Sequence, residues 1–350
     1  MPAENEVLLV TIDESLSSEV LRLAAAAGVQ PRLITSAEEA LASWGSGAAI
    51  LVGADLAGAC AALTPPRRPG VQVLTQGAAN TSTYAAALAL SAEGMVDLSL
   101  TPNWLLEILS NLGDTAGPPG LIVGILGGCG GAGASVFATA LAQASSRSRT
   151  TLLIDADQLG TGIERILGQD SLPGARWDAL SGASGRLSGW SLRDSLPSWQ
   201  QLSLLCFPND QPVTLDPASV RRVLEAARRG FDLVVVDLPR QLDPVSLEVL
   251  ARSDQLLLVL PMTFAALAAG TRVSRRLPDS NLARQLIARG SGLVVPDEAA
   301  ATMGLPLLAA MPNQRGLDED IYLGAGPLRR HRGPLNRTAR AVVEALVGDR

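Results

Sequence analysis

Continuous apolar runs constrain the fold of this 350-residue chain most strongly. The run FDLVVVDLP (231–239) has no alternation of polar and apolar residues, and neither do GLIVGIL (120–126), TLLIDAD (151–157) and DQLLLVLP (254–261). Strands of this kind are buried on both faces, as in parallel sheets covered by helices on two sides. Helical segments separate these runs. Residues 121–350 are therefore expected to form a doubly wound α/β sheet.

A second, shorter β-α alternation precedes this part. Strand-like segments such as VLLVTID (7–13), AAILVGAD (48–55) and GVQVLTQ (70–76) alternate with helical ones, which predicts another parallel sheet with helices on both faces. The glycine- and proline-rich stretch GDTAGPPG marks the seam. We therefore predict a first domain over residues 1–113, a linker over 114–120 and a second domain over 121–350.

The residue types that are scarce exclude several kinds of chemistry. The chain has no lysine, so all 28 basic residues are arginine, and its one histidine is His331. Lysine Schiff bases, histidine-based triads and HExxH zinc sites are therefore excluded. The cysteines at 60, 129 and 206 form no CxxC pair, and no apolar run approaches the roughly 20 residues that span a bilayer. A cytoplasmic protein without a transmembrane segment is expected.

The loop GGCGGAGAS (127–135) lies between an apolar strand and an alanine-rich helix and fits two patterns. Three of its glycines, Gly128, Gly130 and Gly133, spell the dinucleotide fingerprint G-x-G-x-x-G, with Asp155 or Asp157 as the ribose-binding acid about 20 residues on. The same loop fits the phosphate-binding pattern G-x-x-x-x-G-K-[ST] with alanine in the lysine position.

The surrounding sequence favours the phosphate-binding loop. A P-loop protein holds Mg²⁺ with the loop hydroxyl and an acid at the end of an apolar strand, and Ser135 and Asp237 supply these groups. Backbone N–H groups of residues 130–135 can cradle phosphate without any lysine. A dehydrogenase, in contrast, would lack an acid or base for hydride transfer. A dinucleotide-binding oxidoreductase therefore stays only as a remote alternative.

These motifs resemble those of the ParA/MinD group of P-loop ATPases, whose loop reads K-G-G-x-G-K-[ST]. Residues 121 to about 348 are covered, with Cys129 and Ala134 in the two lysine positions. The resemblance implies phosphate binding by Gly128, Cys129, Gly130, Gly131, Ala132, Gly133, Ala134, Ser135 and Val136. It further implies catalysis by Asp157, Mg²⁺ binding by Ser135, Asp155 and Asp237, and an adenine site near Arg289 and Pro312. ATP or ADP with Mg²⁺ would be the cofactors.

The first domain resembles the receiver domains of response regulators, with Asp13, Glu14 and Thr75 at expected positions. The phosphoacceptor position falls near Gly53, Asp55 comes about two residues late, and no lysine exists. We therefore expect a pseudo-receiver that serves protein contact or dimerisation. A receiver-like domain before such an ATPase is similar to the CpaE/TadZ branch and to actinobacterial septum site-determining proteins.

The expected function is a nucleotide-binding positioning factor for septum site selection or for pilus or secretion machinery. With both lysines absent, ATP hydrolysis is expected to be slow or absent, unless Arg147, Arg149 or Arg289 replaces them. A homodimer is expected, with recruitment to the inner face of the membrane at the septum or pole. Weak contact with DNA or a membrane surface through arginine clusters around 221–229, 272–276 and 329–340 is a further expectation. A nucleotide-independent scaffold is the main alternative.

Overall fold

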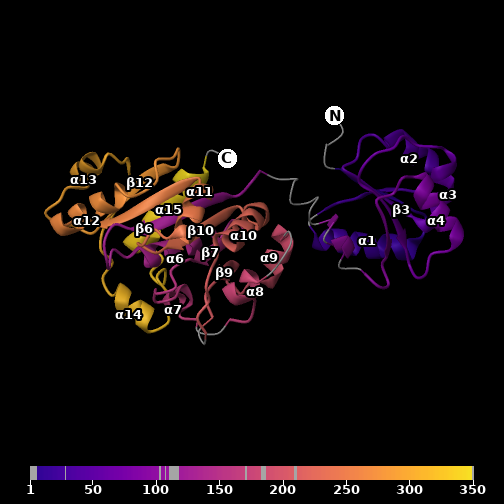
Figure 1. The fold of residues 1–350 in the computed structure, drawn as a ribbon. Coiled ribbons are helices and arrows are strands. Elements are labelled where there is room, and N and C mark those ends of the chain that lie inside the picture. Colours follow the sequence, from indigo (N-terminus) through magenta and orange to yellow (C-terminus); the bar gives the residue numbers. More distant parts are fainter. Residues whose placement is uncertain are drawn as a thin grey trace. The chain divides into compact units, whose positions relative to one another are not determined.

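The computed structural model describes residues 6–27, 29–101, 104–106, 108–109, 118–169, 172–182, 187–208 and 211–348. The chain divides into two compact units, Met1–Pro118 and Pro119–Arg350 (Figure 1). Of the expected linker 114–120, residues 114–117 lie outside the described part. No helix of the described residues has the length and apolar character needed to cross a membrane.

The first unit is a five-stranded parallel sheet with strand order β2-β1-β3-β4-β5. Its strands are β1 (Val7–Val10), β2 (Arg32–Ile34), β3 (Ala49–Gly53), β4 (Val71–Thr75) and β5 (Gly94–Asp97). Its described helices include α1 (Glu14–Ala26), α2 (Ala37–Ser43), α3 (Ala54–Ala62) and α4 (Thr81–Ala89). Side chains of α2, α3 and α4 pack on one face of the sheet and those of α1 on the other.

The second unit is built on an eight-stranded sheet with strand order β13-β12-β11-β6-β10-β7-β9-β8. The strands are β6 (Leu121–Gly127), β7 (Thr151–Asp155), β8 (Ser198–Trp199), β9 (Leu202–Leu205), β10 (Leu233–Leu238), β11 (Gln255–Pro261), β12 (Ala283–Arg289) and β13 (Leu307–Met311). All neighbouring pairs are parallel except β8 and β9 at one edge. The predicted fold class, two doubly wound parallel-sheet domains, is confirmed, with this antiparallel edge as an unpredicted addition.

Helices cover both faces of the larger sheet (Figure 1). They are α6 (Ala134–Ser145), α7 (Ile163–Leu167), α8 (Trp177–Ser181), α9 (Gly189–Ser195), α10 (Pro217–Gly230), α11 (Pro244–Arg252), α12 (Phe264–Ser274), α13 (Pro296–Met303), α14 (Leu317–Tyr322) and α15 (Pro334–Val347). Successive strand residues point to opposite faces. On β10, Val235 packs with α6 and α15, whereas Val236 packs with α10 and α11.

The last helix, α15, packs on α6 and β13 through an apolar stripe that includes Leu335, Ala339 and Val343. The sequence predicts a helix over 337–346 that packs on the sheet, and the observed helix is one turn longer at its start. Its extra turn begins at Pro334, a residue that suits the first position of a helix because its missing N–H would have no partner there.

Candidate functional site

The glycine loop joins the central strand β6 to the N-terminus of α6. Gly131 and Gly133 have φ of 68° and 84°, a left-handed conformation that L side chains rarely adopt. Gly133 caps α6, so the N–H groups of its first turn have no partner within the helix. They can bind an anion instead, and the helix dipole favours negative charge there.

A cavity of about 680 Å³ opens over this loop. Most of the predicted phosphate-binding residues line it, namely Cys129, Gly130, Gly131, Ala132, Gly133, Ala134, Ser135 and Val136. The predicted catalytic residue Asp157 lines it from the loop that follows β7. Gly128 lies elsewhere, since it lines a neighbouring groove that contains several arginines.

The predicted metal ligands meet below this cavity. Asp237 on β10 and Asp155 on β7 are register partners on adjacent strands. Each aspartate comes two residues after a strand residue that packs on the α6 side, Val235 and Leu153, so both carboxyl groups point to that side of the sheet. The Ser135 side chain lies beside the Asp237 carboxyl group and acts on its pKa.

Both carboxyl groups are 3% exposed and carry shifted pKa values. Burial raises the pKa of Asp155 to about 7, against the opposing effect of backbone N–H groups from Asp157 and Ile163. Burial likewise raises the pKa of Asp237 to about 7, although the neighbouring Ser135 side chain lowers it. The charged groups that act on this pair are other carboxylates. A bound cation would relieve both the repulsion and the cost of burial.

The residues present fit a magnesium ion held together with a nucleotide. Among the described residues, no group of three or more His, Cys, Asp or Glu side chains forms a metal cluster. Mg²⁺ does not require one, because it usually binds one or two carboxylates together with water and substrate phosphates. Ser135 and Asp237 would supply protein oxygens, with Asp155 beside them.

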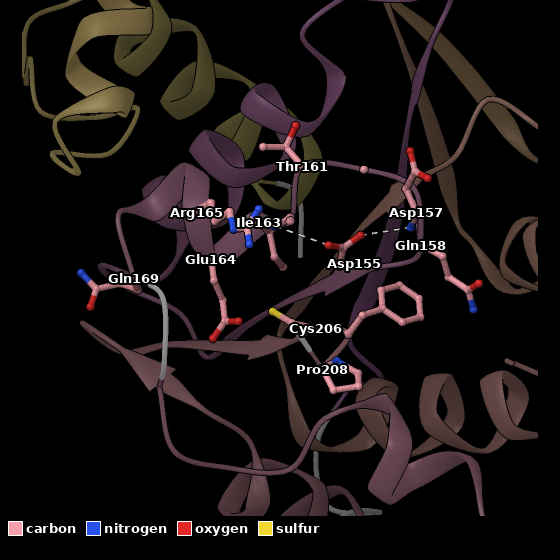
Figure 2. Close-up of a pocket in the computed structure, with 13 residues that line it drawn as sticks. Asp155, Asp157, Gln158, Thr161, Ile163, Glu164, Arg165, Gln169, Cys206 and Pro208 are labelled. Carbon is pink, nitrogen blue, oxygen red and sulfur yellow. Dashed lines mark hydrogen bonds between the residues drawn. The ribbon is translucent and has the colours of Figure 1, made fainter. Parts of the chain in front are cut away.

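The loop after β7 is held by hydrogen bonds to Asp155. Figure 2 shows the Asp155 carboxylate accepting the backbone N–H of Asp157 (3.0 Å) and of Ile163 (3.4 Å). Trp177 is buried and donates its indole N–H to the Asp155 carbonyl at 2.7 Å. The position of Asp157 is therefore set by contacts with the end of β7.

Residues of this loop also line a smaller cavity of about 160 Å³ (Figure 2). Its wall includes the buried Glu164 and Cys206. Arg176 binds the Glu164 carboxylate with two N–H groups, at 2.5 and 2.9 Å. This ion pair anchors α7 to the segment before α8.

The two residues predicted to lie near adenine share one cavity. Arg289 at the end of β12 and Pro312 just after β13 line a space of about 570 Å³ that also reaches Gly133 and Val136 of the glycine loop. The Arg289 guanidinium donates to the carbonyls of Gly131 (3.2 Å) and Ala132 (3.0 Å). It thus braces the loop from the side that faces β12.

The other two arginines considered as replacements for the lysines lie elsewhere. Arg147 and Arg149 precede β7, whereas the glycine loop, Asp155 and Asp237 lie where strands end. In a parallel sheet these are opposite ends of the strands, so the structure gives no support to a replacement of the lysines by Arg147 or Arg149. Sequence reasoning missed Arg240, which follows β10 and lines the loop cavity. Its place just beyond a strand end, where sites of open α/β sheets lie, is the signal that could have found it.

The sheet order separates the two interpretations of the glycine loop. In a dinucleotide-binding fold, the strand that carries the ribose acid lies next to the glycine-loop strand. Here β10 lies between β6 and β7, so Asp155 is one strand away and Asp237 is the neighbour. This order is incompatible with the dinucleotide fingerprint and compatible with a P-loop site.

In the first unit, neighbouring side chains occupy the space beside Gly53, the position expected for the phosphoacceptor. The Asp55 carboxylate accepts the Thr11 hydroxyl (2.9 Å) and the backbone N–H of Ile12 (2.7 Å), while Asp13 caps α1. A Cβ atom at Gly53 would lie 2.2 Å from an Asp55 carboxylate oxygen. Position 53 therefore has no room for a side chain while Asp55 keeps this conformation.

The arginine clusters differ in their partners. In the first, Arg228 pairs with Asp254 at 3.0 Å, and in the third, Arg330 pairs with Asp320 at 2.9 Å. His331, beside the third cluster, is exposed. Within the described part of the chain, no ion pair forms at the members of the middle cluster, Arg272, Arg275 and Arg276.

Comparison with solved structures agrees with this geometry. A ParA family ATPase from Chlorobium tepidum TLS superimposes with a TM-score of 0.59 at 21% identity, over 66% of this chain and 99% of that protein. The septum site-determining protein MinD from Pyrococcus horikoshii OT3, solved with Mg-ADP, gives a TM-score of 0.56 at 21% identity, over 64% and 95%. The second unit therefore has the ParA/MinD fold.

Residues 10–120 match the family described as Rv3660c-like, CheY-like N-terminal domain. Fold and site thus define a ParA/MinD-type P-loop protein with an N-terminal receiver-like domain, which is the CpaE-like layout. The protein Rv3660c of Mycobacterium tuberculosis (strain ATCC 25618 / H37Rv) is 35% identical over 340 residues, which cover 95% of this chain and 96% of that protein. The chain belongs to the Rv3660c family.

Proposed function

We propose that this protein is a nucleotide-binding spatial-positioning factor. It binds ATP or ADP with Mg²⁺ in the cavity over the glycine loop and acts in septum site selection or in localisation of pilus or secretion machinery. One observation carries the proposal: the N-terminus of α6 and Ser135 line one cavity, and Ser135 lies beside the buried Asp237, the register partner of Asp155. The positioning role is supported by the fold shared with a septum site-determining protein.

Binding without rapid hydrolysis is the expected activity. The glycine loop presents no cationic side chain of its own, because Cys129 and Ala134 occupy the lysine positions. Removing one donor aimed at developing charge commonly lowers kcat by about 10²–10³-fold. Asp157 would orient the attacking water, yet turnover would remain slow or absent.

A homodimer would cover this cavity. Tyr322 lines the cavity and is 89% exposed, and Leu159, between Asp157 and the lining residue Gly160, is 94% exposed. Large apolar side chains exposed beside a binding cavity are typical of an interface. The change Tyr322→Ser is expected to lower the dimer fraction that MgATP induces, as measured by light scattering. An unchanged dimer fraction would argue against this face.

Partners and location follow as parts of the same proposal. The protein would act in the cytoplasm with division or pilus machinery, recruited to the inner face of the membrane at the septum or pole. The unpaired cluster Arg272, Arg275 and Arg276 is the surface best suited to a weak contact with DNA or anionic lipid. The receiver-like unit would serve protein contact or dimerisation, since its phosphoacceptor position is closed.

Calorimetric titration of the full chain with ATP, ADP and NAD, with and without Mg²⁺, tests the proposal. Magnesium-dependent ATP binding is expected, and Ser135→Ala should weaken it about tenfold or more, since it removes a hydroxyl aimed at the metal site. The matched control is Ser148→Ala. Ser148 is an exposed serine that precedes β7, at the end of the strands opposite to the glycine loop. Absence of nucleotide binding would favour a nucleotide-independent scaffold, and binding of NAD would favour an oxidoreductase.

A further inference from the structure

An arginine-rich groove adjoins the glycine loop. It has a volume of about 810 Å³ and is lined by Gly128 of the loop together with Arg240, Arg272, Arg275 and Arg276. All four arginines are exposed, and no described acidic side chain lies within ion-pair distance of them. The groove therefore carries uncompensated positive charge next to the proposed phosphate site.

Arg240 differs from the other three because it borders both spaces. It lines this groove and also the cavity over the glycine loop, where Asp157 and Ser135 lie. Its Nη1 atom lies 3.8 Å from the position that a Cβ atom on Gly130 would occupy. The guanidinium therefore stands beside the loop backbone.

The local chain explains why Arg240 stays at this edge. It follows the buried strand β10 after Pro239, whose ring restricts the backbone φ. Because β10 lies between β6 and β7, the residue that follows its end emerges between the glycine loop and the loop after β7. The strand β10 thus places Asp237 at the proposed metal site, and Arg240, just after its end, beside the glycine loop.

Arg289 and Arg240 have different roles on this geometry. Arg289 is engaged by the carbonyls of Gly131 and Ala132, so it braces the loop. Arg240 has no hydrogen-bond or ion-pair partner among the described residues and faces a loop that has alanine in the lysine position. A guanidinium presents several N–H donors and can bind phosphate oxygens in pairs.

We propose that Arg240 supplies, from outside the glycine loop, the positive charge that holds the phosphate tail of the nucleotide. The assignment rests on the proposed nucleotide binding and adds to it a residue that no P-loop pattern contains. The cation reaches the site from the end of β10 and does not come from the loop.

The test is the affinity of the full chain for MgATP in wild type, Arg240→Ala, Arg240→Lys and Arg272→Ala. Removing a charge-assisted hydrogen bond is expected to weaken binding by about 10–100-fold in Arg240→Ala, with partial recovery in Arg240→Lys. Arg272→Ala removes the same charge from the groove without touching the loop cavity and should change the affinity less than about threefold. Arg240 is exposed, so the thermal unfolding temperature should stay unchanged.

Three results would overturn the assignment. Wild-type affinity in Arg240→Ala would refute it and leave the proposed nucleotide binding intact. Equal losses in Arg240→Ala and Arg272→Ala would show a general effect of groove charge and refute the specific role. No MgATP binding by the wild type would refute both the proposed function and this assignment.

Discussion

Asp155 and Asp237 are register partners on the adjacent strands β7 and β10, and both carboxyl groups are buried on the α6 side of the sheet. Two buried carboxylates without a cationic neighbour destabilise a fold unless they hold protons or bind a metal ion. In a protein selected for stability alone, one of them would be expected to be apolar. Their juxtaposition is therefore best explained by ligand binding.

This pair predicts how stability depends on pH. The pKa of each carboxyl rises from 3.8 to about 7 on folding, so between these values the folded chain holds protons that the unfolded chain has released. The contribution of this pair to the free energy of unfolding should therefore be largest at about pH 4 and below, and fall as pH rises through about 7, in the absence of Mg²⁺ and nucleotide. Thermal unfolding across pH 4–8 measures this.

The change Asp237→Asn should remove much of that dependence. The variant cannot ionise at this position, so its Tm relative to wild type should rise between pH 4 and pH 8, by several degrees, since 1 kcal/mol shifts Tm by about 2–4 °C at this domain size. MgATP should stabilise wild type but not the variant. Asp279→Asn removes one negative charge from an exposed position and serves as the control. A parallel pH profile for Asp237→Asn and wild type would contradict the prediction.

Arg289→Ala should loosen the glycine loop. The variant loses the two hydrogen bonds to the carbonyls of Gly131 and Ala132, each a contact with a charged donor. We expect faster amide hydrogen exchange in residues 128–135 and MgATP binding weaker by about tenfold. Arg284→Ala, at the other end of β12, should leave exchange in the loop unchanged. Unchanged loop exchange in Arg289→Ala would show that Arg289 does not brace the loop.

Gly53→Ala should destabilise the first unit through a clash with Asp55. The added Cβ would lie 2.2 Å from the Asp55 carboxylate, and overpacking of this kind typically costs about 1–3 kcal/mol. Asp55→Ala removes the nearest obstacle and leaves the Thr11 hydroxyl at 2.7 Å, so the double variant should lose less than the sum of the single losses in urea unfolding. Additive losses would mean that the two positions do not interact. Acetyl phosphate should leave wild-type residues 6–101 unmodified.

Arg176→Met should strongly destabilise the second unit. Glu164 would then keep a buried carboxylate without its partner, and breaking such a pair typically costs about 3–5 kcal/mol. The double variant Arg176→Met/Glu164→Gln removes the charge as well and should recover part of the loss. Urea unfolding measures both. A double variant less stable than Arg176→Met would indicate that Glu164 has another partner.

Much of the fold was predictable because its strands carry a strong pattern. The continuous apolar run of β10 predicts a parallel sheet. The order of the motifs predicts that Ser135 and Asp237 belong to one site, and the two residues are neighbours in the structure. The two-residue strand β8 was not predictable, since two residues carry no periodicity. Its antiparallel pairing depends on a neighbouring edge that only the assembled sheet provides.

The arginines show which part of the site sequence reasoning could not place. Arg147 and Arg149 are close to the glycine loop in sequence but precede β7 at the opposite edge of the sheet. Arg240 is more than a hundred residues from the loop and lines its cavity, because β10 is inserted next to β6. Proximity at a site of this fold depends on strand order, and strand order cannot be inferred from spacing along the chain.

The insertion of β10 between β6 and β7 also affects how the second unit can be assembled. β6 and β7 are the first strands of this sheet to be synthesised, and they do not pair with each other. The strand that joins them, β10, follows the end of β7 by about eighty residues. Until β10 emerges, β6 has no partner strand and β7 can pair only with β9 on its other edge, so the unpaired edges are open to other chains. A truncated product that ends before β10 would therefore be prone to aggregation, and the glycine loop cannot be studied as an isolated fragment.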